Sequence, residues 1–202
     1  MSIEQFWDDC HKQQKNNYLS NCSFEETVDF LKVQEFIKPS LNILEVGIGN
    51  GHVLQGLNRK GADVYALDIA ITALNKVKHL CKEVYHISEI DKLKKNFFDL
   101  VISHNVVQHI PTPDLIEEFR YIISSLKKDG LFAFEFVSNN ADLDSWQNAF
   151  KFNKNLPTFC RQPVFMKALL ASMNAQGEVV VSNKCDFKKV KGCHVIHARR
   201  KE

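Results

Sequence analysis

Hydrophobic and polar residues alternate in blocks along the middle of the chain. Short apolar runs, each with the length of a buried strand, lie at residues 41–46, 63–67, 84–87, 97–103 and 131–137. Between several of these runs, apolar residues recur at helical spacing, at residues 50–59, 70–81 and 112–130. Strands that alternate with helices of this length predict a parallel sheet covered by helices on both faces.

The N-terminal segment is predicted to be helical. Ser23 and Glu26 have the spacing of a capping box, and Phe24 and Val28 follow at helical spacing. Pro39 is expected to stop this helix, because proline cannot continue the hydrogen bonds of a helix interior.

The C-terminal third of the chain follows a different pattern. Thr112 is expected to cap the helix before the fifth strand, and Gly130 to end it. Another helix is expected at about 163–175, with strands at 178–187 and 193–200. A short lysine-rich turn joins these two strands, so they must pair antiparallel. The predicted fold is α/β: a doubly wound, mostly parallel seven-stranded sheet with an antiparallel C-terminal hairpin.

A chain of 202 residues is long enough for one domain with a full core. Neither a linker nor a repeat interrupts it, so a single domain over residues 1–202 is expected. Its predicted parts are a helical N-terminal segment, a core, an insert with a helix and a terminal hairpin, at residues 1–39, 40–137, 138–177 and 178–202.

Glycines follow the first predicted strand at alternate positions. Gly47, Gly49 and Gly51 allow the backbone to come close to a ligand at the carboxyl end of a parallel strand. His52 stands where a dinucleotide fingerprint would have its third glycine, which weakens the prediction of a pyrophosphate site. Glu45, just before the loop, would repel phosphate and suit a cationic ligand.

Asp68 ends the second predicted strand, twenty-one residues after Gly47. A carboxylate at this place can accept hydrogen bonds from both hydroxyls of an adenosine ribose. It could also act as a helix N-cap before Ala70, and the two roles are compatible.

Four segments in this order, residues 41–51, 64–68, 98–111 and 126–131, resemble successive motifs of class I S-adenosylmethionine-dependent methyltransferases. The resemblance covers residues 40–137, and the terminal hairpin is similar to the sixth and seventh strands of that family. It implies S-adenosylmethionine as the cofactor.

The resemblance also implies a cofactor site. Its expected members are Glu45, Gly47, Ile48, Gly49, Gly51, Asp68, Ile69, Ser88, Glu89, Ile90, His104, Asn105 and Val106. The glycine loop would pass under the methionine part of the cofactor, and Glu45 would orient its amino end. Asp68 would hold the ribose and Ile69 would pack on adenine. Ser88 and Glu89 are both candidates for the adenine amino group.

His109 is the candidate catalytic base, because histidine titrates near neutral pH and this residue follows the fourth strand. A role in packing or gating is the alternative, and His104 is a second candidate base.

The aromatic residues Phe6, Trp7 and Tyr18 belong either to a lid over the cofactor or only to the core. The insert at 138–177 could face an acceptor substrate.

Six cysteines without a CxxC pair predict reduced thiols and a cytoplasmic location. Cys185, Cys193, His194 and His197 lie near one another, but their spacing matches no zinc pattern, so no metal is expected. The simpler prediction is a strand with Cys193 and His197 on one face and His194 on the other.

The net charge of +2 is too close to neutral to indicate a nucleic-acid partner. Residues 184–202 hold seven Lys or Arg against two acids, which is typical of lysine-protected edge strands. A contact of this basic tail with RNA or an anionic substrate is the alternative. No apolar run approaches the roughly 20 residues of a membrane helix, and the polar, acidic N-terminus does not resemble a secretory signal.

The predicted function is methyl transfer from S-adenosylmethionine to a small-molecule acceptor, at a hydroxyl oxygen. Oxygen is favoured by His109 and by the lack of the Asn/Asp-Pro-Pro-aromatic motif of many amino-group methyltransferases; the chain reads Ser103-His104-Asn105-Val106 there. A nicotinamide-dependent oxidoreductase and a catalytically silent cofactor-binding protein are the alternatives. The sequence does not specify the oligomeric state.

Overall fold

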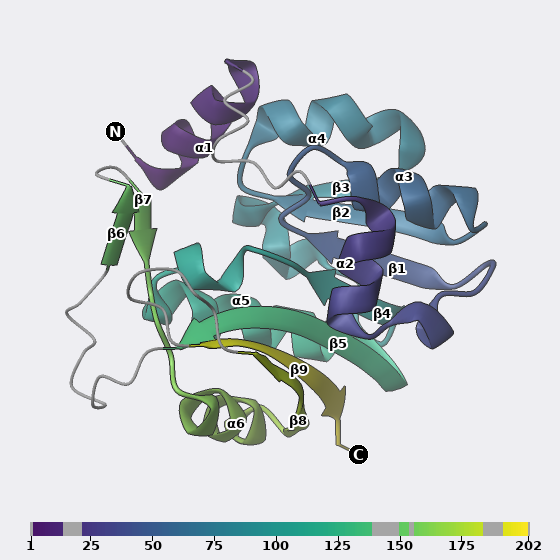
Figure 1. Ribbon diagram of the computed structural model, residues 1–202. Helices are drawn as coiled ribbons and strands as arrows, with labels where there is room; N and C mark the ends of the chain where they lie inside the picture. The colour runs from purple at the N-terminus through teal and green to yellow at the C-terminus, as the bar shows by residue number, and fades with distance from the viewer. Residues whose placement is uncertain (1, 14–21, 139–149, 154–155, 184–191, 202) are drawn as a thin grey trace.

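The computed structural model describes residues 2–13, 22–138, 150–153, 156–183 and 192–201. Its main sheet has seven strands in the order β3-β2-β1-β4-β5-β9-β8 (Figure 1). The strands are β1 (Asn42–Val46), β2 (Asp63–Asp68), β3 (Glu83–His86), β4 (Phe98–Ser103), β5 (Leu126–Ser138), β8 (Ala175–Asn183) and β9 (Gly192–Arg200). The first five strands pair in parallel, and β9 pairs antiparallel with both β5 and β8. The predicted fold is therefore confirmed.

Helices cover both faces of the sheet. One face packs against α2 (Phe24–Leu31), α3 (His52–Arg59) and α4 (Ile71–Val77), and the other against α5 (Thr112–Ser125) and α6 (Pro163–Ser172). Strand residues alternate between the two layers: Leu100 and Ile102 pack with the first group, and Val101 between them packs with the second. Helix α1 (Ile3–Lys12) lies against α4, as Figure 1 shows.

Short elements complete the chain. Four 3₁₀ helices are η1 (Gln34–Phe36), η2 (Lys78–Leu80), η3 (Ile87–Lys92) and η4 (Val107–His109). Strands β6 (Phe150–Asn153) and β7 (Leu156–Thr158) form a separate two-stranded ribbon. Residue 159, just after β7, donates its backbone N–H to the carbonyl of Gln108 in η4 (2.6 Å), so the predicted insert reaches the element that carries His109.

The capping box that begins α2 is confirmed, since Ser23 and Glu26 exchange both hydrogen bonds. The predicted end of this helix was wrong. The helix stops at Leu31, well before Pro39, because Lys32 adopts a left-handed conformation (φ 56°) and donates its N–H to the carbonyl groups of the preceding turn.

The predicted boundary between α5 and β5 was also wrong. The helix ends at Ser125 and the strand begins at Leu126, because Leu126 pairs with Phe98 before a β-bulge in the ladder. Gly130 lies inside the strand, where a Cβ atom would be 2.8 Å from the carbonyl oxygen of Phe98. At the other end of α5, Pro111 occupies the N-cap position that was predicted for Thr112.

The alternation predicted for the last strand is confirmed. His197 donates from Nε2 to the carbonyl of Leu31 on the α2 side (2.7 Å). His194 stacks on Phe136 on the opposite face and bonds to Ser138 Oγ (2.7 Å). Cys185 lies outside the described residues, and within them no three His, Cys, Asp or Glu side chains are placed to hold a metal ion.

In the part of the chain that the structure describes, no helix has the length and apolarity to cross a membrane.

Candidate functional site

The glycine loop turns sharply at the end of β1. Gly47, Gly49 and Gly51 all have positive φ angles, of 73°, 50° and 77°. Gly47 donates its N–H to the carbonyl of Leu67 at the end of β2 (2.8 Å), which ties the loop to the neighbouring strand. A Cβ atom on Gly47 would lie 2.2 Å from Cγ2 of Val106. The loop therefore needs glycine here both for its backbone angle and for its close contact with the segment after β4.

Asp68 joins this loop to the turn after β2. Its Oδ2 atom accepts the N–H of Ile48 (2.8 Å) and its Oδ1 atom accepts the N–H of Ala70 (2.7 Å). The side chain is only 7% exposed, and this burial raises its pKa to about 6. Each carboxylate oxygen can accept more than one hydrogen bond, so the group can also take hydroxyl donors from a ligand.

A cavity of about 370 Å³ opens beside this loop. It brings together eight of the predicted site residues: Gly47, Gly49, Asp68, Ile69, His104, Asn105, Val106 and His109. The carboxyl ends of β1, β2 and β4 meet at one edge of the sheet, which explains why segments so far apart in sequence share this cavity.

The remaining predicted residues do not line this cavity: Glu45, Ile48, Gly51, Ser88, Glu89 and Ile90. In η3 the lining residue is Ile87, whereas Ser88 bonds to His86 Nδ1 (2.8 Å) and Ile90 belongs to the core. Glu89 pairs with Lys92 at the surface. Neither of the two residues predicted for the adenine amino group, Ser88 and Glu89, therefore lines the cavity.

Glu45 faces α3 instead of the cavity. Its buried carboxyl group accepts the backbone N–H of Leu54 in the first turn of that helix, and its Oε2 atom has no partner among the described residues. Burial raises the pKa of Glu45 well above its usual range, and the nearby charge of Asp68 raises it further. Because side chains alternate along a strand, it is Val46, the next residue, that lines the cavity.

The two histidines of the cavity have different environments. His104 lies between Thr27 Oγ1 (3.3 Å from Nδ1) and Glu135 Oε2 (3.4 Å from Nε2), and burial lowers its pKa to about 4. It is thus neutral at pH 7 and a weak base. His109, at the end of η4, has its ring centroid 5.5 Å from that of Trp7. The lowered pKa of His104 counts against the second of the two predicted bases.

Helix α1 covers the cavity. Ile3, Trp7 and His11 are four residues apart, so they lie on one face of the helix, and all three line the cavity. Trp7 also packs against the core on the α2 side, so its position has features of both predicted roles. Tyr18 lies outside the described residues.

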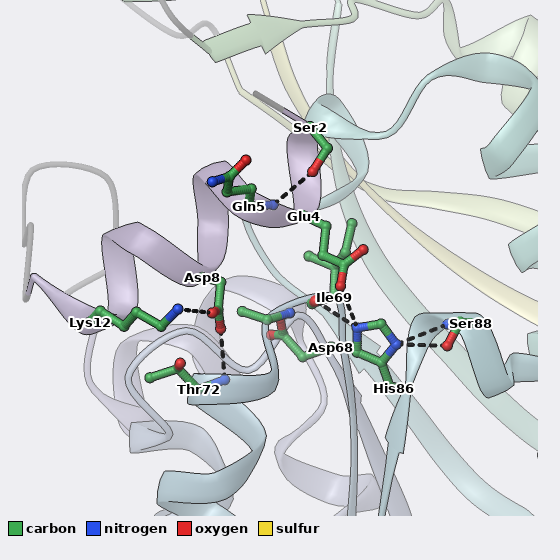
Figure 2. Close-up of polar contacts among 11 residues, drawn as sticks. Ser2, Glu4, Gln5, Asp8, Lys12, Asp68, Ile69, Thr72, His86 and Ser88 are labelled. Atoms are coloured by element: carbon green, nitrogen blue, oxygen red, sulfur yellow. Dashed lines mark hydrogen bonds and ion pairs between the residues drawn. The ribbon is translucent and has the colours of Figure 1, made fainter.

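Polar contacts hold α1 in this place. Asp8 Oδ1 accepts the N–H of Thr72 in the first turn of α4 (2.8 Å), as Figure 2 shows. Asp8 thereby caps α4 from a different helix, since Ala70 at the N-cap position of α4 offers no side-chain bond. Lys76 Nζ donates to the carbonyl of His11 (2.8 Å). In the same view, His86 donates to the carbonyl of Ile69 (2.9 Å).

We expect Asp8→Ala to loosen this cover. Loss of a cap costs about 1 kcal/mol, which corresponds to a roughly fivefold faster release of S-adenosylhomocysteine if α1 must open for release. Stopped-flow fluorescence of Trp7 would measure the rate. Asp9→Ala, which removes the same charge from the same helix, is the control and should leave the rate unchanged. An unchanged rate in Asp8→Ala would show that α1 does not control release.

Sequence reasoning missed Arg161, which secures the segment after η4. This buried side chain donates from Nη1 to the carbonyl of Val107 (2.8 Å) and from Nη2 to that of Ile110. Burial lowers its pKa to about 10. No local signal in the sequence points to Arg161, because its partners lie about fifty residues earlier.

Further lining residues were also missed, among them Gln108, Asp114 and Glu118. The last two are acids one helical turn apart in α5, and this spacing was a readable signal that they share a face.

The residues of this site fit S-adenosylmethionine. Gly47 and Gly49 line the cavity with bare backbone, and the Asp68 carboxylate provides acceptors for ribose hydroxyls. Apolar side chains of Leu67, Ile69 and Ile87 can pack on a flat base. The described residues that line the cavity include no Lys or Arg, so nothing there repels a positively charged sulfur.

Comparisons with known proteins agree with this geometry. A model of the family described as methyltransferase domain matches residues 16–182, so the chain belongs to this family. This confirms the resemblance to the class I S-adenosylmethionine-dependent methyltransferases. Phosphoethanolamine N-methyltransferase 2 of Caenorhabditis elegans is 27% identical over 124 residues, which are 56% of this chain and 28% of that protein. The chain thus spans about a quarter of the length of this relative.

Solved structures share the fold at low sequence identity. A SAM-dependent methyltransferase of Methanosarcina mazei has a TM-score of 0.65 and 13% identity, over 85% of this chain and 98% of that one. Magnesium protoporphyrin IX methyltransferase of Synechocystis with bound SAH has a TM-score of 0.62 and 15% identity. The match covers 100% of this chain and 89% of that one. The third structure is 1,6-didemethyltoxoflavin-N1-methyltransferase of Burkholderia thailandensis with bound 1,6-didemethyltoxoflavin and S-adenosylhomocysteine. It has a TM-score of 0.69 and 15% identity, and the match covers 99% of this chain and 88% of that one.

Proposed function

We propose that this chain transfers the methyl group of S-adenosylmethionine to a small-molecule acceptor, at a hydroxyl oxygen. The observation that carries the proposal is the cavity that joins Gly47 and Asp68 to His109. Its volume of about 370 Å³ suits a small molecule rather than a polymer. Helix α1 contributes Ile3, Trp7 and His11 to its lining.

When bound, the cofactor supplies a methyl group on a positively charged sulfur. The chain contributes alignment and exclusion of water. Asp68 would hold the ribose hydroxyls, and Ile3 and Trp7 would keep water from the reacting atoms. His109 would take the proton of the acceptor hydroxyl onto a ring nitrogen as the oxygen becomes nucleophilic. His104, with its lowered pKa, is less able to do this.

We expect His109→Gln to lower kcat by about 10²- to 10⁴-fold, the usual contribution of a general base. Affinity for S-adenosylhomocysteine should stay unchanged, because glutamine keeps the size and polarity of the side chain. His79→Gln, at an exposed histidine of η2, is the control. Turnover of His109→Gln equal to that of the unmodified chain would remove His109 from the reaction.

The acceptor would be found by incubating the chain and S-adenosylmethionine with pooled metabolites and identifying products that are heavier by the mass of one CH₂ group. Two of the similar proteins are named N-methyltransferases, so nitrogen is the alternative acceptor atom. NMR of the product separates the two: a methyl group on nitrogen would overturn the oxygen assignment. Binding of NAD without binding of either sulfur compound would overturn the proposal as a whole.

A further inference from the structure

The lining that α5 contributes to the cavity is rich in hydrogen-bond acceptors. Asp114 and Glu118 line it from successive turns of α5. Neither carboxyl group has a hydrogen-bond or ion-pair partner among the described residues. Carboxylates accept hydrogen bonds and carry negative charge, so this wall presents no donor to a ligand when both are ionised.

Gln108 is an independent sign of a ligand at this place. It lines the same cavity, its side chain is 6% exposed, and its Oε1 atom has no hydrogen-bond partner among the described residues. An unpaired buried acceptor costs free energy that a ligand donor can recover. His11, opposite on α1, is 2% exposed with an equally unpartnered Nδ1 atom. Burial lowers the pKa of His11 to about 4, so the ring is neutral.

We propose that the acceptor substrate carries a protonated amino group, which binds against Asp114 and Glu118 and donates a hydrogen bond to Gln108. The inference rests on the proposed function and adds the charge of the substrate to it. The ring of Trp7, which also lines the cavity, is suited to the alkyl groups or the charge of an ammonium ion. The described lining residues include no Lys or Arg, so a phosphate or carboxylate on the substrate would find no ion partner there.

The charges around Glu118 agree with a cationic ligand. Burial, followed by the charges of Asp114 and Glu117, raises the pKa of Glu118 to about 8, so this carboxyl group holds its proton at pH 7. The other titratable groups that share the cavity with it are Asp68, His11, His104 and His109. A bound cation favours the ionised carboxylate, so amine binding should release a proton.

The test uses the chain saturated with S-adenosylhomocysteine, which lacks the charge on sulfur. The probes are 2-(dimethylamino)ethanol and 3-(dimethylamino)propan-1-ol, each paired with an uncharged alcohol of the same shape, 3-methylbutan-1-ol and 4-methylpentan-1-ol. Calorimetry at pH 7 should show at least one amine binding roughly tenfold or more tightly than its partner alcohol. Titration in two buffers of different ionisation enthalpy should show proton release.

Charge-neutral variants separate a role in recognition from a general effect. Asp114→Asn and Glu118→Gln should each reduce the preference for the amine to a few-fold, whereas Glu117→Gln, on the same helix but not in the cavity lining, should keep it. Equal affinity for amine and alcohol, no binding of either amine, or an unchanged preference in both variants would overturn the inference. If S-adenosylhomocysteine itself does not bind the unmodified chain, the proposed function fails; if it binds without a preference for amines, only this inference fails.

Discussion

Gly47→Ala is expected to abolish binding of S-adenosylmethionine and to destabilise the fold by about 2–5 kcal/mol, the sum of a left-handed alanine and an overpacked contact. The φ angle of 73° disfavours any residue with a Cβ atom. The added carbon would also lie 2.2 Å from Val106 Cγ2, which forces the loop and the segment after β4 apart. Urea unfolding measures the stability, and calorimetry with S-adenosylhomocysteine measures binding.

Gly49→Ala is the matched control. Gly49 also has a positive φ angle, of 50°, but no atom of the described residues lies within 4 Å of the place that a Cβ atom would take. The free energy of unfolding of this variant should fall by only about 1 kcal/mol, the cost of an alanine in the left-handed conformation. Adding Val106→Ala to Gly47→Ala should restore part of the stability, because it removes the clash and leaves the strained angle. Unaltered stability in Gly47→Ala would mean that the loop can shift at little cost.

Asp68→Asn is expected to weaken binding of S-adenosylhomocysteine by about 2–4 kcal/mol, or roughly 30- to 1000-fold. The amide nitrogen of asparagine would point at one of the two N–H donors, of Ile48 or Ala70, that the carboxylate now accepts. The neutral side chain would also be a weaker acceptor for ribose hydroxyls. Calorimetry measures the loss. Asp63→Asn, at the opposite end of β2 and paired with Lys82 (3.1 Å), is the control and should bind normally.

The pH dependence of stability and of ligand affinity provides a second test of Asp68. Asp68 has a pKa of about 6 in the folded protein against an ordinary value of 3.8, so the ligand-free fold holds this proton more tightly than the unfolded chain does. Its contribution to the free energy of unfolding therefore decreases as the pH rises from about 4 to 6. Affinity for the ribose should rise over the same range, because the ionised carboxylate is the better acceptor. A flat pH profile for the unmodified chain, equal to that of Asp68→Asn, would contradict the assignment.

Much of the site could be predicted from the sequence because its chemistry is local to strand ends. Gly47 and Asp68 each follow an apolar run directly, and parallel strands bring their carboxyl ends to one edge. His109 lies a few residues after the fourth strand, at the end of η4. Side chains alternate between the two faces of a strand. This alternation places the carboxyl group of Glu45 against α3 rather than in the cavity.

Contacts between segments far apart in sequence decided the rest. The boundary of α5 depends on pairing between Leu126 and Phe98, which outweighs the local preference of the Gly130 turn. The cover over the cavity depends on Asp8 meeting Thr72, and the position of His109 depends on the segment held by Arg161.

The sequence by itself determined the class of fold, the glycine loop and the aspartate at the second strand, because periodicity and turn chemistry act over a few residues. Only the tertiary structure decided which helix covers the cavity and which charged side chains line it. Those features arise when α1 and α5 pack at the same edge of the sheet. Patterns over a few neighbouring residues do not predict which helices pack together there.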